Sequence, residues 1–307
     1  MNAESTIHIN GLTKTFGTVR AVDDLSFTVQ PGRVTGFLGP NGSGKTTTLR
    51  MLLGLIAPTA GEAHIGGKPY SGLDHPGKVV GAALEASSFH PGRTGLDHLR
   101  VHTPQIGVPD ARAHELLEFV GLGDAKNRRV AGYSMGMRQR LALAFALLGD
   151  PSVIILDEPA NGLDPQGIAW LRQLLRAFAA QGRTVLVSSH VLTEVEHTVD
   201  DVVVIAKGRK VHASSLAELR QLASRTVSID GPDRTRITQL ASDNHWRWSE
   251  SNTGILIHDV NAADVGARAF AANIELHRLV DADVGLEDVF LKLTSDTEAP
   301  VSLGGAA

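Results

Sequence analysis

Residues 39 to 46 have the types and spacing that can hold a triphosphate. They read Gly-Pro-Asn-Gly-Ser-Gly-Lys-Thr, match G-x-x-x-x-G-K-[ST], and stand between the apolar run Val34 to Leu38 and a predicted helix. Small residues let successive backbone N–H groups face phosphate oxygens, and the helix start adds its positive end. Lys45 is expected to bridge the β and γ phosphates, and Thr46 to ligate Mg²⁺. The alternative is a glycine-rich turn that only joins a strand to a helix. The expected nucleotide contacts in this loop are Gly39, Pro40, Asn41, Gly42, Ser43, Gly44, Lys45, Thr46 and Thr47.

Two adjacent acids, Asp157 and Glu158, follow the aliphatic run Val153 to Leu156. A buried strand that ends in a carboxylate places it at the edge where α/β sheets bind ligands. Asp157 is expected to hold Mg²⁺ through water, and Glu158 to polarise the attacking water as a general base. The alternative is a solvated strand end that does no chemistry.

Short apolar runs predict the strands that position these groups. Val34 to Leu38, Val153 to Leu156 and Thr184 to Val187 are continuous, which is typical of buried parallel strands. Ile7 to Ile9 and Leu25 to Val29 alternate instead, which predicts two antiparallel strands in a small β layer. Residues about 86 to 149 change to helical period and predict a helical insertion.

The C-terminal block, residues 226 to 307, has a pattern of its own. The predicted order is strand, helix, two strands, helix, strand and a terminal helix, or βαββαβ with one helix added. The ranges are strand Thr226 to Ile229, helix Ile237 to Ala241, strands near Trp246 and at Ile255 to Ile257, helix Ala262 to Ala272, a strand near Leu276 and helix Leu286 to Leu293. This order predicts a small α+β domain of ferredoxin-like type after a first domain at residues 5 to 225.

Composition limits the classes of function. The 307 residues are 42% hydrophobic and 20% charged with a formal net charge of −4, as in a folded protein for which nucleic acid is not the favoured partner. The absence of cysteine excludes thiol catalysis, disulfides and thiolate metal sites. The longest apolar run, Leu141 to Leu148, is too short to cross a bilayer, and no secretory signal is visible at the start.

The segment Tyr133 to Arg140, Tyr-Ser-Met-Gly-Met-Arg-Gln-Arg, resembles the signature motif of the nucleotide-binding subunits of ABC transporters. Ser134 is a good N-cap, and the free N–H groups beside it form an anion site with no phosphate of its own. The resemblance implies that Ser134 and Gly136 complete the ATP site of a facing subunit. Met135 and Met137 depart from the common L-S-G-G-Q form and resemble the exporters of the bacitracin and daunorubicin resistance type.

Four further residues fall where that family has functional positions. Asp164, in Asn-Gly-Leu-Asp, resembles the D-loop at the dimer seam, and His190 after a strand resembles the switch histidine that senses the γ-phosphate. Phe16 stands where the family stacks an aromatic ring on adenine; the alternative is a core phenylalanine. Glu85 stands where most members have the Q-loop glutamine, and could approach Mg²⁺ or water; the alternative is a surface glutamate.

The residues after Glu85 belong, by the same resemblance, to the groove that receives a cytoplasmic helix of the membrane subunit. His98 and His102 lie four apart on a predicted helix and could share a metal ion, but the sequence suggests no third ligand.

The resemblance implies an α/β fold of the P-loop NTPase type, an ABC cassette with a mixed sheet and a helical subdomain. It implies an ATPase that uses ATP and Mg²⁺, works as a homodimer, and drives drug efflux through a separate permease at the cytoplasmic face of the membrane.

One alternative is a non-transport ABC ATPase that acts on DNA or ribosomes, but such chains usually carry a long coiled coil or two cassettes. A P-loop kinase or GTPase is disfavoured by the signature segment and by the lack of Asn-Lys-x-Asp. The transported substrate is not encoded here.

Overall fold

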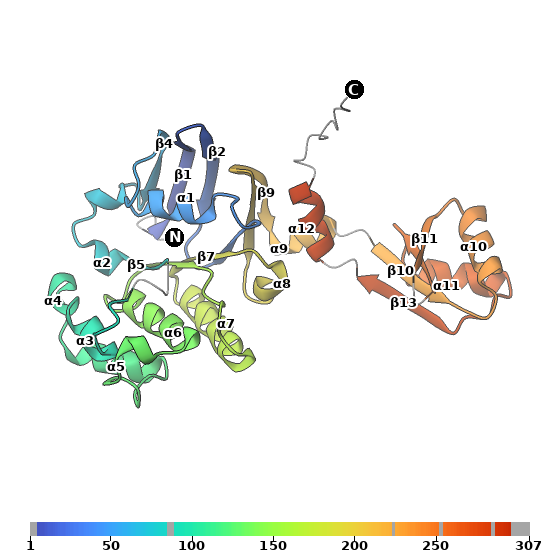
Figure 1. Cartoon of the computed structure of the whole chain (residues 1–307). Coiled ribbons are helices and arrows are strands. Elements are labelled where there is room, and N and C mark those ends of the chain that lie inside the picture. The colour runs from blue at the N-terminus through green and yellow to red at the C-terminus, as the bar shows by residue number, and fades with distance from the viewer. Residues whose placement is uncertain (1–4, 85–88, 223–224, 252–253, 284–285, 296–307) are drawn as a thin grey trace, which may run out of the picture. The chain divides into compact units, whose positions relative to one another are not determined.

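The computed structural model describes residues 5–84, 89–222, 225–251, 254–283 and 286–295 (Figure 1). The chain divides into two compact units. One comprises Met1–Leu216 with Leu293–Ala307, and the other comprises Ala217–Lys292.

A six-stranded mixed sheet forms the centre of the first unit (Figure 1). Its strands, in spatial order, are β5 (Val80–Ala83), β6 (Val153–Asp157), β7 (Thr184–Ser189), β3 (Val34–Leu38), β8 (Asp201–Ala206) and β9 (Arg209–Ser215). All neighbours are parallel except β8 and β9, which are antiparallel. Every residue of β3, β6 and β7 is buried. The continuous apolar runs therefore form parallel strands covered on both faces, as predicted.

A second sheet of three antiparallel strands has the order β2 (Val19–Val29), β1 (Ile7–Phe16) and β4 (Ala60–Ile65). The alternating burial at the start of β1 reflects one face turned inward. The Phe27 ring of β2 lies 5.2 Å from the Phe37 ring of β3, centroid to centroid, within the main core cluster. The predicted β layer is confirmed and is longer than the alternating residues alone indicated.

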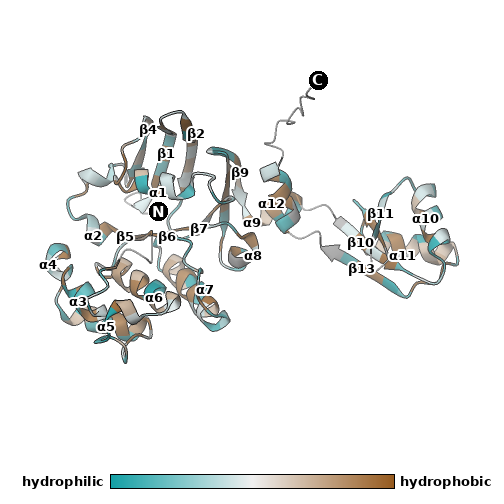
Figure 2. Ribbon diagram, in the orientation of Figure 1, coloured by the Kyte–Doolittle hydropathy of each residue, from teal (hydrophilic) through white to brown (hydrophobic). Residues whose placement is uncertain are grey.

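The first unit also contains helices outside the helical insertion. They are α1 (Lys45–Leu52), α2 (Pro76–Val79), α7 (Pro165–Ala180) and α8 (Leu192–Val195), with the 3₁₀ turn η2 (Tyr70–Gly72). Helix α9 (Leu216–Leu222) starts at the boundary of the two units, and its residues after Leu216 belong to the second unit. Figure 2 shows both hydrophobic and hydrophilic residues along α7, whose buried side chains include Leu171, Leu175 and Phe178. Such an amphipathic helix can pack on a sheet and still face water.

In the described part of the predicted helical insertion, residues 89–149, the structure has four α-helices and one 3₁₀ turn. They are α3 (Gly95–Arg100), α4 (Thr103–Ile106), α5 (Ala111–Phe119), η3 (Val130–Gly132) and α6 (Met135–Ala146). α6 begins earlier than the apolar period alone suggests, because the Ser134 hydroxyl accepts a hydrogen bond from the Met137 N–H at 3.2 Å.

The second unit has a four-stranded antiparallel sheet in the order β11 (Arg247–Ser251), β12 (Gly254–His258), β10 (Arg225–Asp230) and β13 (Arg278–Asp283). Its helices are α10 (Arg234–Asp243), α11 (Ala262–Ala271) and α12 (Leu286–Ser295). The core consists of Val227, Ile229, Ile237, Ala241, Ile255, Ile257 and Val265. β13 begins at Arg278 and not near Leu276, because the Ile274 N–H is still bonded to the Ala269 carbonyl in the cap of α11.

Among the described residues, no helix has the length and apolar character needed to span a bilayer.

Candidate active site

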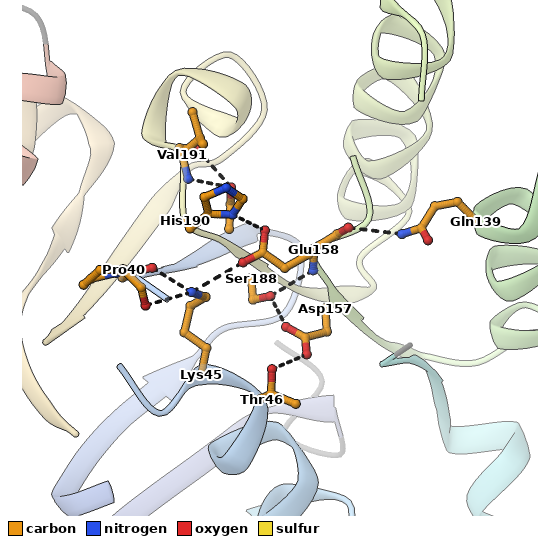
Figure 3. Close-up of polar contacts among 11 residues, drawn as sticks. Pro40, Lys45, Thr46, Gln139, Asp157, Glu158, Ser188, His190 and Val191 are labelled. Carbon is orange, nitrogen blue, oxygen red and sulfur yellow. Dashed lines mark hydrogen bonds and ion pairs between the residues drawn. The ribbon is translucent and has the colours of Figure 1, made fainter. Parts of the chain in front are cut away.

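The site lies at the carboxyl ends of β6, β7 and β3, which are neighbours in the sheet. β3 leads into the loop of residues 39–44, β6 ends at Asp157, and β7 ends just before His190. Because parallel strands end at the same edge, three segments distant in sequence meet there. Figure 3 shows their side chains directed toward one another.

The loop before α1 needs its glycines. Gly44, the N-cap of α1, has a φ of 105°, a left-handed conformation that L side chains rarely adopt. A Cβ there would also lie 2.5 Å from the Ala21 carbonyl oxygen. The loop therefore passes close to the β-layer backbone and keeps the start of α1 open toward the site.

Lys45, the first residue of α1, is buried at 6% exposure although it carries a charge. Its Nζ donates to the Gly39 carbonyl at 2.6 Å and to the Pro40 carbonyl at 3.3 Å. It also lies 3.4 Å from Glu158 Oε1. The lysine side chain therefore folds back over its own loop and faces Glu158. An anionic group of a ligand could replace the Glu158 carboxylate as its partner.

The Asp157 carboxylate is held from two sides. The Thr46 hydroxyl donates to Asp157 Oδ2 at 2.7 Å, and the Ser188 hydroxyl of β7 donates to Asp157 Oδ1. A hydroxyl and a carboxylate oxygen in contact are the hard ligands that Mg²⁺ prefers, and a phosphate-bound Mg²⁺ needs only one or two protein carboxylates. The residues present therefore fit the ion.

The Glu158 side chain points away from Thr46 and Ser188, the partners of Asp157, and toward Lys45 and His190 (Figure 3). His190 Nδ1 and Glu158 Oε2 are 2.8 Å apart, and the Glu158 N–H donates to Ser188 Oγ at 3.0 Å. The backbone of Glu158 has a φ of 50°, in the left-handed region that costs a residue with a Cβ free energy. Such strain often occurs at functional positions.

Two contacts here were not foreseen from the sequence. Ser188 bridges Asp157 and the Glu158 backbone, and Gln139 of α6 donates from Nε2 to the Glu158 carbonyl at 3.1 Å. The position of Ser188 at a strand end beside His190 was a usable signal. Gln139 offered none, because the face that α6 turns to β6 depends on packing.

The remaining signature and D-loop residues lie together within the chain. Gly136 faces the Gly162 carbonyl, which a Cβ on Gly136 would meet at 2.9 Å. Asp164 is the N-cap of α7, its Oδ1 accepting from the Gly167 N–H at 2.8 Å. Ser134 is exposed at the start of α6. Ser134 and Asp164 are thus exposed, and Gly136 is half-buried.

Phe16 ends β1 with its side chain 49% exposed, so it is not a core phenylalanine, and Lys14 Nζ lies 5.1 Å from its ring centroid. An exposed ring is free to stack on a flat ligand. Glu85 lies outside the described residues.

An aromatic-lined hollow of about 450 Å³ lies beside the helical region. It is lined by Arg50, Leu53, Leu55, Tyr70, Ala82, Ala83, Leu84, Phe89, His98, His102, Ala142 and Phe145. Burial, with smaller electrostatic contributions from the neighbouring His102 and Arg93, lowers the pKa of His98 to about 4. Throughout the described part of the chain, no group of three His, Asp or Glu side chains is arranged to hold a metal ion, so no third ligand of these types accompanies His98 and His102 there.

The chain was compared with known proteins. A family model described as ABC transporter matches residues 22–161. Bacitracin transport ATP-binding protein BcrA of Bacillus licheniformis is 34% identical over 296 residues, 94% of this chain and 96% of that protein. Nod factor export ATP-binding protein I of Paraburkholderia xenovorans is 36% identical over 298 residues, 95% of this chain and 97% of that protein.

Solved structures agree on the fold. The ATP-binding subunit of an ABC transporter superposes with a TM-score of 0.64 at 28% identity, covering 71% of this chain and 92% of that one. A dimeric bacterial ABC transporter cassette gives 0.63 at 25% identity, covering 68% and 98%. With its phosphate loop, its acidic strand end and relatives that match almost its full length, the chain belongs to the ABC transporter family as one of its ATP-binding proteins and is an ATPase.

Proposed function

We propose that this chain is the ATP-hydrolysing subunit of an exporter that moves its cargo through a separate membrane permease. The observation that carries the proposal is the meeting of Lys45, Thr46, Asp157, Glu158 and His190 at one sheet edge. The names of the relatives support export, since they include bacitracin transport and Nod factor export proteins. The chain would then act at the cytoplasmic face of the membrane.

In this proposal, Lys45 and the N–H groups of residues 39–47 hold the β and γ phosphates of ATP. Thr46 and Asp157 would hold Mg²⁺, which supplies charge neutralisation on the transferred phosphoryl group when bound. Glu158 accepts a proton from the attacking water and so acts as general base. His190, whose ring already contacts Glu158, would donate to the γ-phosphate and orient that carboxylate. Phe16 would stack on the adenine, and Glu85 would approach the metal or the water.

Two copies would complete each other's sites. Ser134 and Gly136 stand at the start of α6, where free N–H groups and the helix dipole favour an anion. Lys45, the proposed phosphate-holding lysine, lies in the loop after β3 and not at the start of α6. A nucleotide held by a second copy is therefore proposed as the ligand of Ser134 and Gly136, with Asp164 at the seam. A homodimer is therefore proposed.

The second unit is proposed to be an accessory domain of ferredoxin-like type, with the domain boundary near residue 225. Support comes from the order β10-α10-β11-β12-α11-β13 and from the sheet order β11-β12-β10-β13. The permease is proposed to dock at the aromatic-lined hollow that includes Phe89 and His98.

The test is the variant Glu158→Gln, which keeps the shape of the side chain and removes its basicity. ATP should bind but not turn over, so the protein should elute as a dimer from a sizing column with ATP and as a monomer without it. Lys45→Ala is the matched control and should stay monomeric, because its phosphate grip is lost. An ATP-loaded Glu158→Gln protein that remains monomeric would contradict the proposed sandwich. Co-purification with a polytopic membrane protein checks the exporter assignment separately.

A further inference from the structure

The backbone of Glu158 is held at both of its polar groups. Its N–H donates to Ser188 Oγ at 3.0 Å, and its carbonyl accepts from Gln139 Nε2 at 3.1 Å and from the Asn161 N–H at 3.2 Å. Ser188 and Asn161 belong to segments next to the site, whereas Gln139 comes from α6, the helix that Ser134 caps (Figure 3). Of these three partners, only Gln139 links the acid to the helical region.

This contact acts on a strained residue. Glu158 has a φ of 50°, which a residue with a Cβ adopts only when its surroundings hold it there. The carbonyl direction depends on the backbone torsion ψ of Glu158, and the Cα–Cβ bond of the side chain starts from the same backbone. A donor that fixes the carbonyl therefore restrains the backbone from which the carboxylate extends toward Lys45 and His190.

Helix α6 can carry a displacement from Ser134 to Gln139. The two positions are about 7.5 Å apart along a regular helix, so they move together. Arg140, the next residue, ties the helix to the neighbouring elements: its Nη1 donates to the Val120 carbonyl at 2.9 Å, and its guanidinium lies 5.3 Å from the Trp170 ring centroid. A displacement of α6 at this point would therefore move Gln139 and change the contacts of Arg140 together.

We propose that Gln139 is a positioning residue that sets the Glu158 backbone according to the position of the α6 N-terminus. The inference rests on the proposed roles of Glu158 as general base and of Ser134 as a phosphate contact across the dimer. When a nucleotide bound to the second copy contacts Ser134 and fixes the start of α6, Gln139 then aligns Glu158 of the same chain as Ser134. Each chain would thereby sense, inside itself, whether the other site is filled.

The test separates the N–H donor of Gln139 from its bulk. Gln139→Met has nearly the same length and no donor, whereas Gln139→Lys retains N–H donors. Gln139→Met is expected to lower kcat about five- to ten-fold with the KM for ATP unchanged within about two-fold, because the hydrogen bond of Gln139 goes to the backbone of the proposed general base, whereas residues 39–47 are proposed to hold the phosphates. Gln139→Lys should keep at least about half of the wild-type kcat. Gln173→Met, the same change at an exposed position of α7, is the matched control and should be silent.

A pH profile adds a readout that packing alone would not give. In Gln139→Glu the ionised carboxylate would face the Glu158 carbonyl and repel it, whereas the protonated acid would donate to it. The half-buried position beside a carbonyl raises the pKa of such a carboxyl above its ordinary value of about 4.3. The kcat of Gln139→Glu divided by that of Gln139→Met should therefore rise as the pH falls from about 8 toward the pKa of that carboxyl.

The outcomes distinguish the inference from the function on which it rests. If Glu158→Gln is inactive and Gln139→Met turns over like wild type, the inference fails and the proposed function stands. If Glu158→Gln retains turnover, the general-base assignment itself fails. Equal losses in Gln139→Met and Gln139→Lys would overturn the inference as well, since the donor would then not matter. Thermal unfolding of each variant excludes misfolding. If Gln139→Met is unstable, the kcat of Gln139→Glu is divided by that of the wild type at each pH instead.

Discussion

The mixed sheet of the first unit and the antiparallel sheet of the second unit differ in where charged side chains are buried. Both have central strands of buried aliphatic residues. In the six-stranded sheet the ends of those strands meet two buried charged side chains, Lys45 at 6% and Asp157 at 8% exposure. In the described residues of the second unit, the buried polar side chains are the neutral Thr226 and Ser228. Its ion pairs, such as Arg247 with Asp259, are exposed.

This difference shows which sheet is organised for chemistry. Burying a charge costs free energy unless it is paired and hydrogen-bonded, and a buried pair adds little net stability over apolar packing. In the first sheet, the buried charges of Lys45 and Asp157 lie at one edge, where hydrogen bonds and ion pairs offset the free energy of burying them. In the described part of the second sheet the buried polar side chains are neutral, so this sheet is expected to contribute packing without catalysis.

The largest expected effect comes from removing the buried lysine. Lys45→Ala should lower ATP turnover by at least about a hundred-fold, because the charge that faces the phosphates is lost. The melting temperature should stay within a few degrees, since the contacts of Lys45 go to two backbone carbonyls of its own loop and to Glu158. Steady-state turnover and thermal unfolding measure both, and Lys68→Ala, an exposed lysine paired with Asp74, is the control. Retained turnover would remove the basis for treating this edge as catalytic.

The next effect concerns the second unit alone. Ile257 is fully buried in its core, so Ile257→Ala should cost about 3 kcal/mol, and Ile257→Val about 1 kcal/mol. Amide hydrogen exchange should show lost protection in residues 225–283 and unchanged protection in residues 5–216. Turnover should change less than about two-fold. A parallel loss of turnover and of protection in the first unit would show that the two sheets are not independent.

The smallest effect is a pH dependence of the first unit. Burial lowers the pKa of His98 to about 4 from 6.5, so folding favours the neutral ring. Stability from this group is complete above pH 6.5 and is lost as the pH falls through that value toward 4. At pH 5 the loss is about 2 kcal/mol. His98→Phe should remove that part of the pH dependence in urea unfolding between pH 7 and 4.5, whereas His75→Phe, at an exposed position, should not. If the free energy of unfolding changes with pH equally in the wild type and in His98→Phe, the assignment of this pH dependence to His98 is wrong.

Local sequence was a good guide wherever structure depends on neighbours in the chain. The caps, the glycine loop and the apolar periods depend on a few adjacent residues, and helix Ala262–Ala271 of the second unit matches its prediction within one residue. The Ser134 cap is confirmed for the same reason. Strand Arg278–Asp283 was placed too early, because the preceding residues still close the cap of α11.

The sequence by itself determined that a phosphate loop follows one buried strand and that two acids end another, since both depend on residue type and spacing. Only the tertiary structure decided that Thr46 bonds to Asp157, 111 positions away, that Ser188 lies between Asp157 and the Glu158 backbone, and that Gln139 holds the Glu158 carbonyl. The physical reason is that these partners are chosen by the order of strands in the sheet and by the face that α6 turns inward. Both are results of packing the whole unit, which no local stretch of residues contains.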